Sequence, residues 1–470
     1  MENRASFLTL LASAALLILG LPPLGLWPLS WMAFVPIFLL LERNDTSRTS
    51  WFGISLLIGF FYFGYGIYWL WNYDFTIYTS ALLCLIPCFA VLFFSFGYFR
   101  NSLKDSTFYY FLAPTLWIIL MKIYSLTPLG NIAQEVPFYG PFSFFQIASV
   151  SGFKTHGALV LGLNAAIAAG IHKKTRRAFI ACAVFILLLV SSYSLGSARL
   201  KERHPEEKIK AALIQHNLPA IQLWNISHSR EIFETYRRLA LEASKGKPDL
   251  IIFPLYSLPG DLLRHPDFFT DLARQADTPI LIATYVPQVE SNRDAGFFDM
   301  ALLYSPQGTV SDIYQAIQPP PFRRIGETNI AEYKLLNTPA GRAGIFLCYE
   351  NALERMGRKA VNLGADFFIS LSNPGFFNQS FMPDYHWMQD RLRAVESGRY
   401  VLRVSPNGYS GLIDPLGRVI QKTSLDKEEI LTLSFGTRQE KTFYHRNPDW
   451  VFWMASIFIA GLLIKRRRPV

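Results

Sequence analysis

The sequence has little cysteine and little charge for its length. Its 470 residues include only 4 cysteines, and 17% are charged, against about a quarter in an ordinary soluble protein. So few cysteines exclude a disulfide-stapled scaffold, and a hydrophobic content of 51% excludes a disordered chain. The chain also lacks a phosphate-binding GxxxxGK[S/T] loop and a cysteine–histidine cluster with zinc spacing. The sequence therefore predicts no nucleotide or metal cofactor.

Long apolar runs at the two ends of the chain account for the low charge. The runs cover residues 5–21, 24–41, 51–71, 77–99, 108–124, 156–171, 178–195 and 449–464. Most of them reach the length of about 17–25 residues that a helix needs to cross a bilayer, and tryptophans lie near several of their ends. A single run of this kind is equally typical of a buried core helix. Eight together predict a bundle of about eight transmembrane helices.

The basic residues follow the orientation rule for membrane proteins. With the N-terminus in the cytoplasm, alternate loops carry the lysines and arginines, and the opposite short loops are nearly free of them. These basic positions are Arg43, Arg48, Arg100, Lys104, Lys173, Lys174, Arg176, Arg177 and Lys465–Arg468. The pattern predicts that both termini are cytoplasmic, and it explains most of the net charge of +10. Because the basic excess reports topology, we expect no nucleic-acid partner.

The middle of the chain has the composition of a soluble α/β domain, in which short apolar runs alternate with helical patterns. Strands are expected at 210–215, 250–253, 280–284, 299–304, 343–347, 367–370 and 400–404. Helices are expected at 229–244, 266–275, 352–363 and 385–397, and the turn at 414–417 indicates a closing hairpin. We therefore expect seven membrane helices in 1–200, an exported α/β domain in 205–440, and a final membrane helix with a basic tail in 445–470.

One cysteine stands apart from the others as a candidate nucleophile. Cys84, Cys88 and Cys182 lie inside the apolar runs, where cysteine behaves as a small apolar residue. Cys348 instead follows the strand pattern 343–347 and precedes a helical pattern. A helix N-terminus and nearby backbone amides can stabilise a thiolate at such a turn. From spacing alone, a buried structural cysteine is the more common explanation of such a residue.

The segment Leu347-Cys348-Tyr349-Glu350 resembles the nucleophile motif of the apolipoprotein N-acyltransferases, a membrane branch of the nitrilase (carbon–nitrogen hydrolase) superfamily. Further similar segments are ALIQHNLP at 212–219, IIFP at 251–254, SLSN at 370–373, RLRAVE at 391–396, NGYS at 407–410 and DPLG at 414–417. The resemblance implies a multi-pass protein of the bacterial inner membrane. It also implies a periplasmic nitrilase-like α-β-β-α sandwich inserted before the last helix.

The resemblance also implies a chemistry carried by three side chains. In this family a glutamate is the general base, a lysine stabilises the oxyanion and the cysteine attacks a phospholipid ester. The acyl chain then passes from a cysteine thioester to the amino terminus of a lipoprotein. The partners implied are membrane phospholipid and lipoproteins, and no cofactor is required.

Two of the three positions depart from the family pattern. Where the family has Pro-Glu-x-x-x-Pro, this chain has PLYSLP at 254–259, which places Leu255 at the glutamate position. Where the family has Tyr-x-Lys-x-x-Leu-Val-Pro-Phe, the chain has YQAIQPPPF at 314–322, which places Ala316 at the lysine position. A general base contributes about 10²–10⁴ to a rate, and one oxyanion donor about 10²–10³. The usual mechanism should therefore be slowed by several orders of magnitude.

The sequence leaves several roles open. Glu350 fits a supporting catalytic acid or a buried structural acid equally well, and Glu327 is a second candidate support. Replacement groups could come from these two acids or from the nearby basic residues Arg323, Arg324 and Lys334. The leading hypothesis is a non-catalytic or altered lipid- or lipoprotein-binding homologue. The alternative is an active acyltransferase with a rebuilt site around Cys348, and a third, weaker one is a partner subunit for another membrane protein.

Overall fold

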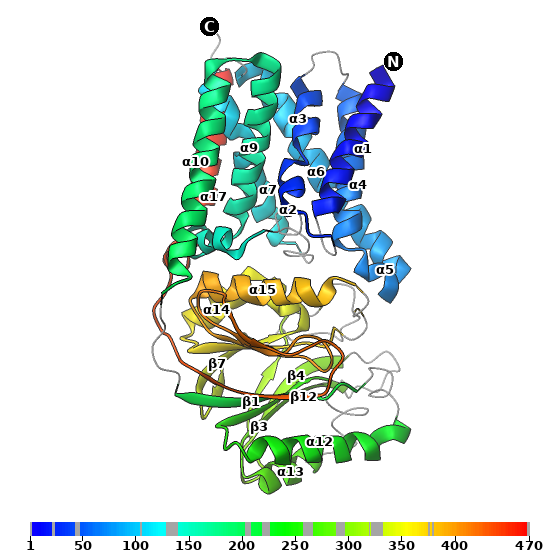
Figure 1. The fold of residues 1–470 in the computed structure, drawn as a ribbon, viewed down its shortest axis with the longest axis vertical. Helices are drawn as coiled ribbons and strands as arrows, with labels where there is room; N and C mark the ends of the chain where they lie inside the picture. Colours follow the sequence, from blue (N-terminus) through cyan, green and yellow to red (C-terminus); the bar gives the residue numbers. More distant parts are fainter. Residues whose placement is uncertain are drawn as a thin grey trace. The chain divides into compact units, whose positions relative to one another are not determined.

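The computed structural model describes most of the chain. The described residues are 2–20, 24–42, 48–103, 106–127, 140–202, 208–218, 226–256, 267–287, 297–318, 332–374 and 380–467, with Pro320 and Phe377. The chain forms two compact units (Figure 1). One comprises Met1–Lys201 with Arg446–Val470, and the other comprises Glu202–His445.

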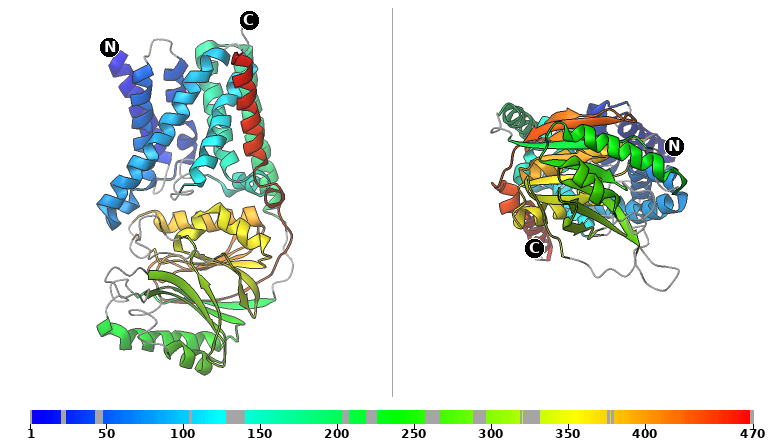
Figure 2. Two further views of the ribbon diagram at one scale, coloured as in Figure 1. Left: turned by 180° about the vertical axis from the view of Figure 1, so that it is seen from behind. Right: turned by 90° about the horizontal axis from the view of Figure 1, so that it is seen from below.

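The first unit is helical. Its α-helices are α1 (Glu2–Gly20), α2 (Trp27–Met32), α3 (Val35–Glu42), α4 (Arg48–Gly66), α5 (Trp69–Tyr73), α6 (Phe75–Leu103), α7 (Leu112–Ser125), α8 (Ala148–Ser151), α9 (Lys154–Lys173), α10 (Arg176–Arg199) and α17 (Trp450–Arg467). Short 3₁₀ turns lie at Thr107–Phe111 (η1) and Phe142–Ile147 (η3). Although α17 comes last in the sequence, it packs beside α7 (Figure 2).

Four of the described helical segments are long and apolar enough to cross a membrane. They are Phe75–Arg100, Thr107–Ser125, Lys154–Lys173 and Arg176–Arg199. The other predicted spans correspond to shorter apolar helices in the described residues, so the expected number of eight stays a prediction. Large apolar side chains on α10 such as Phe179 and Leu187 are exposed in the unit, at 59% and 65%. Such a surface suits a hydrocarbon environment and not water.

Polar contacts tie the first unit together where its helices break or end. The Asn164 side chain of α9 accepts a hydrogen bond from the Phe34 amide (3.1 Å) and donates one to the Trp31 carbonyl (2.5 Å). It thereby satisfies backbone groups that the break between α2 and α3 would leave unpaired. At the start of α17, Asp449 pairs with Lys122 of α7 (2.6 Å). This ion pair anchors the last helix to the bundle.

The second unit contains two six-stranded sheets. The first has the order β12-β1-β2-β3-β4-β5 and the second has the order β11-β10-β9-β8-β7-β6. The first-sheet strands are β1 (Ile209–Gln215), β2 (Leu250–Leu255), β3 (Ile280–Pro287), β4 (Phe297–Tyr304), β5 (Val310–Gln315) and β12 (Glu429–Phe435). The second-sheet strands are β6 (Leu336–Thr338), β7 (Gly341–Leu347), β8 (Phe367–Leu371), β9 (Val401–Val404), β10 (Gly411–Ile413) and β11 (Val419–Lys422).

The strand directions bring the ends of several strands to one place. Strands β1, β2 and β3 are parallel, and β5 joins their direction because β3–β4 and β4–β5 are both antiparallel. Strands β7, β8 and β9 are also parallel to one another. The Asn217 amide after β1 donates to the Pro406 carbonyl after β9 (2.7 Å). Both sheets therefore end at the same side of the unit, here called the carboxyl end.

Helices cover the outer faces of both sheets (Figures 1 and 2). Helices α12 (Ser229–Ser244) and α13 (Phe268–Ala276) pack on the first sheet, and α14 (Glu354–Asn362) and α15 (Met382–Ser397) pack on the second. Outward side chains of β2 and β3, such as Phe253 and Ile282, form one apolar cluster with α12 and α13. Because side chains alternate along a strand, their neighbours point inward between the sheets. The unit is therefore an α-β-β-α sandwich, as the sequence predicted.

Candidate active site

Cys348 occupies the turn between β7 and the 3₁₀ turn η6 (Cys348–Ala352) at the carboxyl end. Its backbone has φ of 51°, in the left-handed region that residues with a Cβ seldom adopt. Such a conformation costs on the order of 1–3 kcal/mol and is concentrated at functional sites. The residue is partly exposed and lies outside any disulfide. The turn therefore presents a partly exposed thiol from an unusual backbone conformation.

Glu350 holds this turn in place. Its carboxylate is fully buried and accepts hydrogen bonds from the Tyr314 hydroxyl (2.9 Å) and the Leu347 amide (3.0 Å). It also accepts the amides of Ile317 (2.9 Å) and Gln318 (3.1 Å). Burial raises the pKa of Glu350 to about 7, although these hydrogen bonds act against the shift. These contacts join the end of β5 to the turn at residues 347–352, here called the nucleophile turn because Cys348 is the candidate nucleophile. Glu350 therefore positions this turn.

Leu255 ends β2 at the same side of the unit. A bulge between Ile252 and Leu255 shifts the register, so that Leu255 pairs with Ala283 of β3. The pairing turns the fully buried Leu255 side chain to the inner face of the sheet, which Ala283 shares. The next residue, Tyr256, has φ of 63° and carries its ring to Tyr285, with 6.1 Å between ring centroids. The strand end is thus sharply bent.

Ala316 lies beside the nucleophile turn. It directly follows β5, is partly exposed, and its amide donates to the Asp299 carbonyl of β4 (2.8 Å). Two nearby residues, Tyr314 and Ile317, both bond Glu350. The structure therefore brings Ala316, Glu350 and Cys348 together, and it places Leu255 at the same end of the unit.

The other sequence candidates divide into two groups. Glu327, Arg323 and Arg324 lie outside the described residues. Lys334 is described, and its ammonium group pairs with Asp312 of β5 at 3.1 Å. Lys334 is therefore engaged at the contact between β5 and the segment leading into β6.

The structure adds two charged residues that sequence reasoning missed. Asp299 lies on β4 opposite Ala316, and only 5% of it is exposed. Arg355 of α14 donates to the Gln318 side chain at 2.7 Å, close to the end of β5. The signal for Asp299 was an acid inside an otherwise apolar strand pattern. Arg355 had no signal in the sequence, because its contact with Gln318 joins segments that are far apart in the chain.

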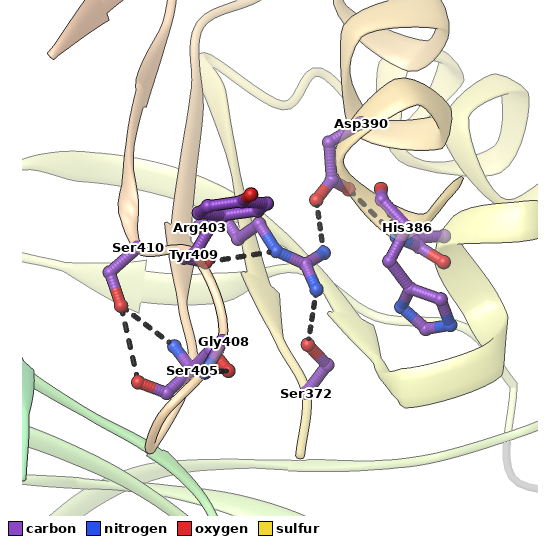
Figure 3. A network of polar contacts seen from close by, with 9 residues as sticks. Ser372, His386, Asp390, Arg403, Ser405, Gly408, Tyr409 and Ser410 are labelled. Atoms are coloured by element: carbon purple, nitrogen blue, oxygen red, sulfur yellow. Dashed lines mark hydrogen bonds and ion pairs between the residues drawn. The ribbon is translucent and has the colours of Figure 1, made fainter. Parts of the chain in front are cut away.

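A buried polar network supports the nucleophile turn from the second sheet (Figure 3). Arg403 of β9 pairs with Asp390 of α15 (2.5 Å) and donates to the Ser372 hydroxyl (2.7 Å). The Asn351 side chain of η6 donates to Asp390 (3.1 Å). Burial, and then the nearby Arg403, hold the pKa of His386 well below its usual range, so its ring is neutral. The network ties η6 to α15 and β9.

In the described part of the chain, no three histidine, cysteine, aspartate or glutamate side chains gather as potential metal ligands. The arrangement is that of a partly exposed cysteine in a fixed turn, with the buried Glu350 as its brace and Asp299 at the same end of the first sheet.

Comparisons with known proteins place these features in a family. Residues 210–436 match the carbon–nitrogen hydrolase family model, and residues 13–166 match the N-terminal domain model of apolipoprotein N-acyltransferases. A protein named apolipoprotein N-acyltransferase from Geobacter metallireducens is 24% identical, over 99% of this chain and 96% of that protein. One of the same name from Thermosynechococcus vestitus is 23% identical, over 92% and 90%.

Solved structures that resemble the chain cover its α/β unit. The carbon–nitrogen hydrolase from Helicobacter pylori G27 is 18% identical, with a TM-score of 0.41, over 54% of this chain and 98% of that one. An amidase from Nesterenkonia sp. is 16% identical, also with a TM-score of 0.41, over 52% and 97%. The two family models together match most of the chain, and the relatives align along nearly all of it. The chain belongs to the apolipoprotein N-acyltransferase family, within the carbon–nitrogen hydrolase superfamily.

Proposed function

We propose that this protein transfers an acyl chain from a membrane phospholipid to the amino terminus of a lipoprotein through a thioester on Cys348. The observation that carries the proposal is the nucleophile turn. Cys348 keeps a left-handed backbone and partial exposure, and the buried Glu350 braces it with four donors. Strained turns of this kind are concentrated at functional sites, which favours a chemical task for Cys348. The name of the relatives, apolipoprotein N-acyltransferase, supports acyl transfer to an amino group of a lipoprotein.

The proposed site is an altered one. Leu255 and Ala316 stand at the family positions of the general base and the oxyanion lysine. Each lost group is worth about two orders of magnitude or more in rate. Triad members act as a unit, so the two losses do not simply multiply. We therefore expect slow acylation, unless other groups take over the two tasks.

The surroundings follow from the family and the charge pattern. We propose an inner-membrane protein with both termini in the cytoplasm. Residues 1–200 and 445–470 would supply eight membrane helices, and residues 205–440 would lie on the periplasmic side. A phospholipid donor and a lipoprotein acceptor would then both reach the site from the same membrane face.

A second candidate is a non-catalytic lipid- or lipoprotein-binding homologue. The observation that favours it is that an apolar side chain, Leu255, fills the base position and is fully buried. Desolvation by such a neighbour keeps a thiol neutral and unreactive. In this case Cys348 would have no chemical task, and Cys348→Ala would leave the biological activity intact at normal protein levels.

Intact-protein mass spectrometry separates the two candidates. The full chain in detergent is incubated with vesicles of phosphatidylethanolamine and phosphatidylglycerol, beside Cys348→Ser and the matched control Cys182→Ser. Acyl transfer predicts a mass gain of one acyl chain in the parent and in Cys182→Ser, and none in Cys348→Ser. No adduct on folded, lipid-binding protein would remove the acyltransferase proposal and leave the binding protein.

A further inference from the structure

Asp299 lies between the two positions at which the family pattern is broken. On one side of it, the Ala316 amide donates to its carbonyl, so the two residues face each other across β4 and β5. On the other side, Asp299 pairs with Tyr285 of β3. Side chains of directly opposed residues project from the same face of a sheet. Tyr285, Asp299 and Ala316 therefore form one row across the first sheet at its carboxyl end.

The row continues to Leu255. The ring of Tyr256 packs against Tyr285, with 6.1 Å between centroids. The bulge in β2 turns Leu255 to the face that Ala283 shares, and Ala283 is two residues before Tyr285 on β3. The carboxylate of Asp299 thus belongs to the same surface as the lost base position and the lost lysine position.

This surface faces the nucleophile turn. Met300, Leu302 and Tyr304 pack on the helix-covered outer side of β4, so the alternate residues Asp299 and Ala301 point inward. Ala301 pairs with Tyr314, whose hydroxyl reaches Glu350 at 2.9 Å, two residues after Cys348. Strand β4 also packs against β7, the strand that ends at the nucleophile. Asp299 is one step nearer the carboxyl end than the Ala301–Tyr314 pair.

Two further acids of the described residues hold the two sheets together and lie outside this row. Glu350 accepts from one hydroxyl and three amides. Asp312, on the same face of β5 but further from the carboxyl end, accepts from Asn337 and Lys334. Neither carboxylate can leave these partners without loosening the contact between the sheets. Asp299 is the buried acid that lies in the row beside the vacated positions.

We propose that Asp299 is the general base that replaces the glutamate missing at Leu255. The inference rests on the acyl transfer proposed above. The Cys348 thiol gives its proton to the Asp299 carboxylate while Sγ attacks the ester carbonyl carbon of the phospholipid. The ester C–O bond breaks, and the departing lyso-phospholipid oxygen takes the proton back from Asp299. The products are an acyl thioester on Cys348 and a neutral lyso-phospholipid hydroxyl, and Asp299 is a carboxylate again.

The test measures the rate of acyl-Cys348 formation in the full chain with the same vesicles. Asp299→Asn keeps the size and removes the base, and we expect acylation to slow about 100-fold or more near neutral pH. Asp299→Glu should retain most of the rate. The matched control Asp312→Asn, a neutralised acid on the same face, should stay within about twofold, because a base acts on the thiol proton directly.

The pH dependence tells a base from a structural residue. At high pH the thiol ionises without help, so the rate of Asp299→Asn should approach that of the parent. Among the described residues, the titratable groups of the neighbouring strands on the same face are Tyr285 and Tyr314, and Tyr314 bonds Glu350; all three are unchanged in this comparison. Equal rates at neutral pH, or a deficit that is the same at every pH, would overturn the role of Asp299. No acylation in the parent would instead overturn the proposed function.

Discussion

At the carboxyl end of the α/β unit, the second sheet carries a partly exposed cysteine in a left-handed turn, whereas the first sheet carries a buried leucine and an alanine. Buried polar contacts of Glu350, Asp390 and Arg403 hold the residues on either side of Cys348. On our proposal, the leucine and the alanine stand where the family has its polar groups. The comparison then teaches that the turn carrying Cys348 keeps its structure without those two groups.

Breaking the support on the second sheet should have the largest effect. Arg403→Ala leaves the Asp390 carboxylate buried without its cation, which we expect to destabilise the protein by about 3–5 kcal/mol. Thermal unfolding of the purified protein measures the loss. The double variant Asp390→Leu with Arg403→Met removes both charges and should recover most of it. A single variant as stable as the parent would show that the network is not what braces the turn.

Restoring a lysine at the end of β5 should have an effect of similar size, in this case on the rate of acylation. Ala316→Lys returns a cation beside the nucleophile turn, and we expect acyl-Cys348 formation to rise by about 10²–10³. Ala316→Met is the matched control, since it adds length without charge. An unchanged rate in the lysine variant would mean that the oxyanion is already stabilised by another group, for which Arg355 beside Gln318 is the first residue to test.

Much of the second unit could be predicted from residue patterns. The strands expected at 210–215, 280–284 and 343–347 correspond to β1, β3 and β7, and the helix expected at 229–244 is α12. The hairpin turn at Asp414–Gly417 is confirmed between β10 and β11. These elements have clear periodicity and turn residues, which are local signals. Strands β5 and β6 were not expected, because β5 is half exposed and β6 has only three residues.

The site was harder to predict than the fold. Cys348 could be chosen because it follows a strand and precedes a helix. The bulge that turns Leu255 inward, and the pairing that sets Asp299 opposite Ala316, arise from strand register. Register depends on partners distant in the sequence, which no local pattern encodes. The role of Glu350 likewise became clear only from its donors on β5.

The stability that Glu350 contributes by bracing the contact between the sheets should depend on pH. Burial raises the pKa of Glu350 from 4.5 to about 7 in the folded protein. The stability this group contributes is therefore fully present below about pH 4.5 and is lost as pH rises through about 7, a loss of about 3 kcal/mol. Glu350→Gln should flatten this part of the stability profile. Profiles of parent and variant that stay parallel from pH 4.5 to 8 would contradict the assignment.

Asp312 should give the smallest change in stability with pH, and in the opposite direction to Glu350. It links β5 of the first sheet to the second sheet through the Asn337 amide (2.8 Å) and Lys334. Burial raises its pKa, but hydrogen bonds from Asn337, Ile313 and Lys334 outweigh that effect and hold the pKa below its usual value. Its contribution is therefore present above about pH 4 and is lost as pH falls through the folded pKa.

We expect Asp312→Asn to cost about 1 kcal/mol near neutral pH, because its contacts are partly exposed to water. The cost should vanish in acid, where the parent carboxylate is protonated, whereas Glu350→Gln should show its difference from the parent only above about pH 5. Thermal unfolding of both variants in one pH series makes the measurement. The contrast between the two contacts would fail if both acids lost their contribution to stability on the same side of neutral pH. In that case the buried Glu350 and the partly exposed Asp312 would not differ in burial as the structure requires.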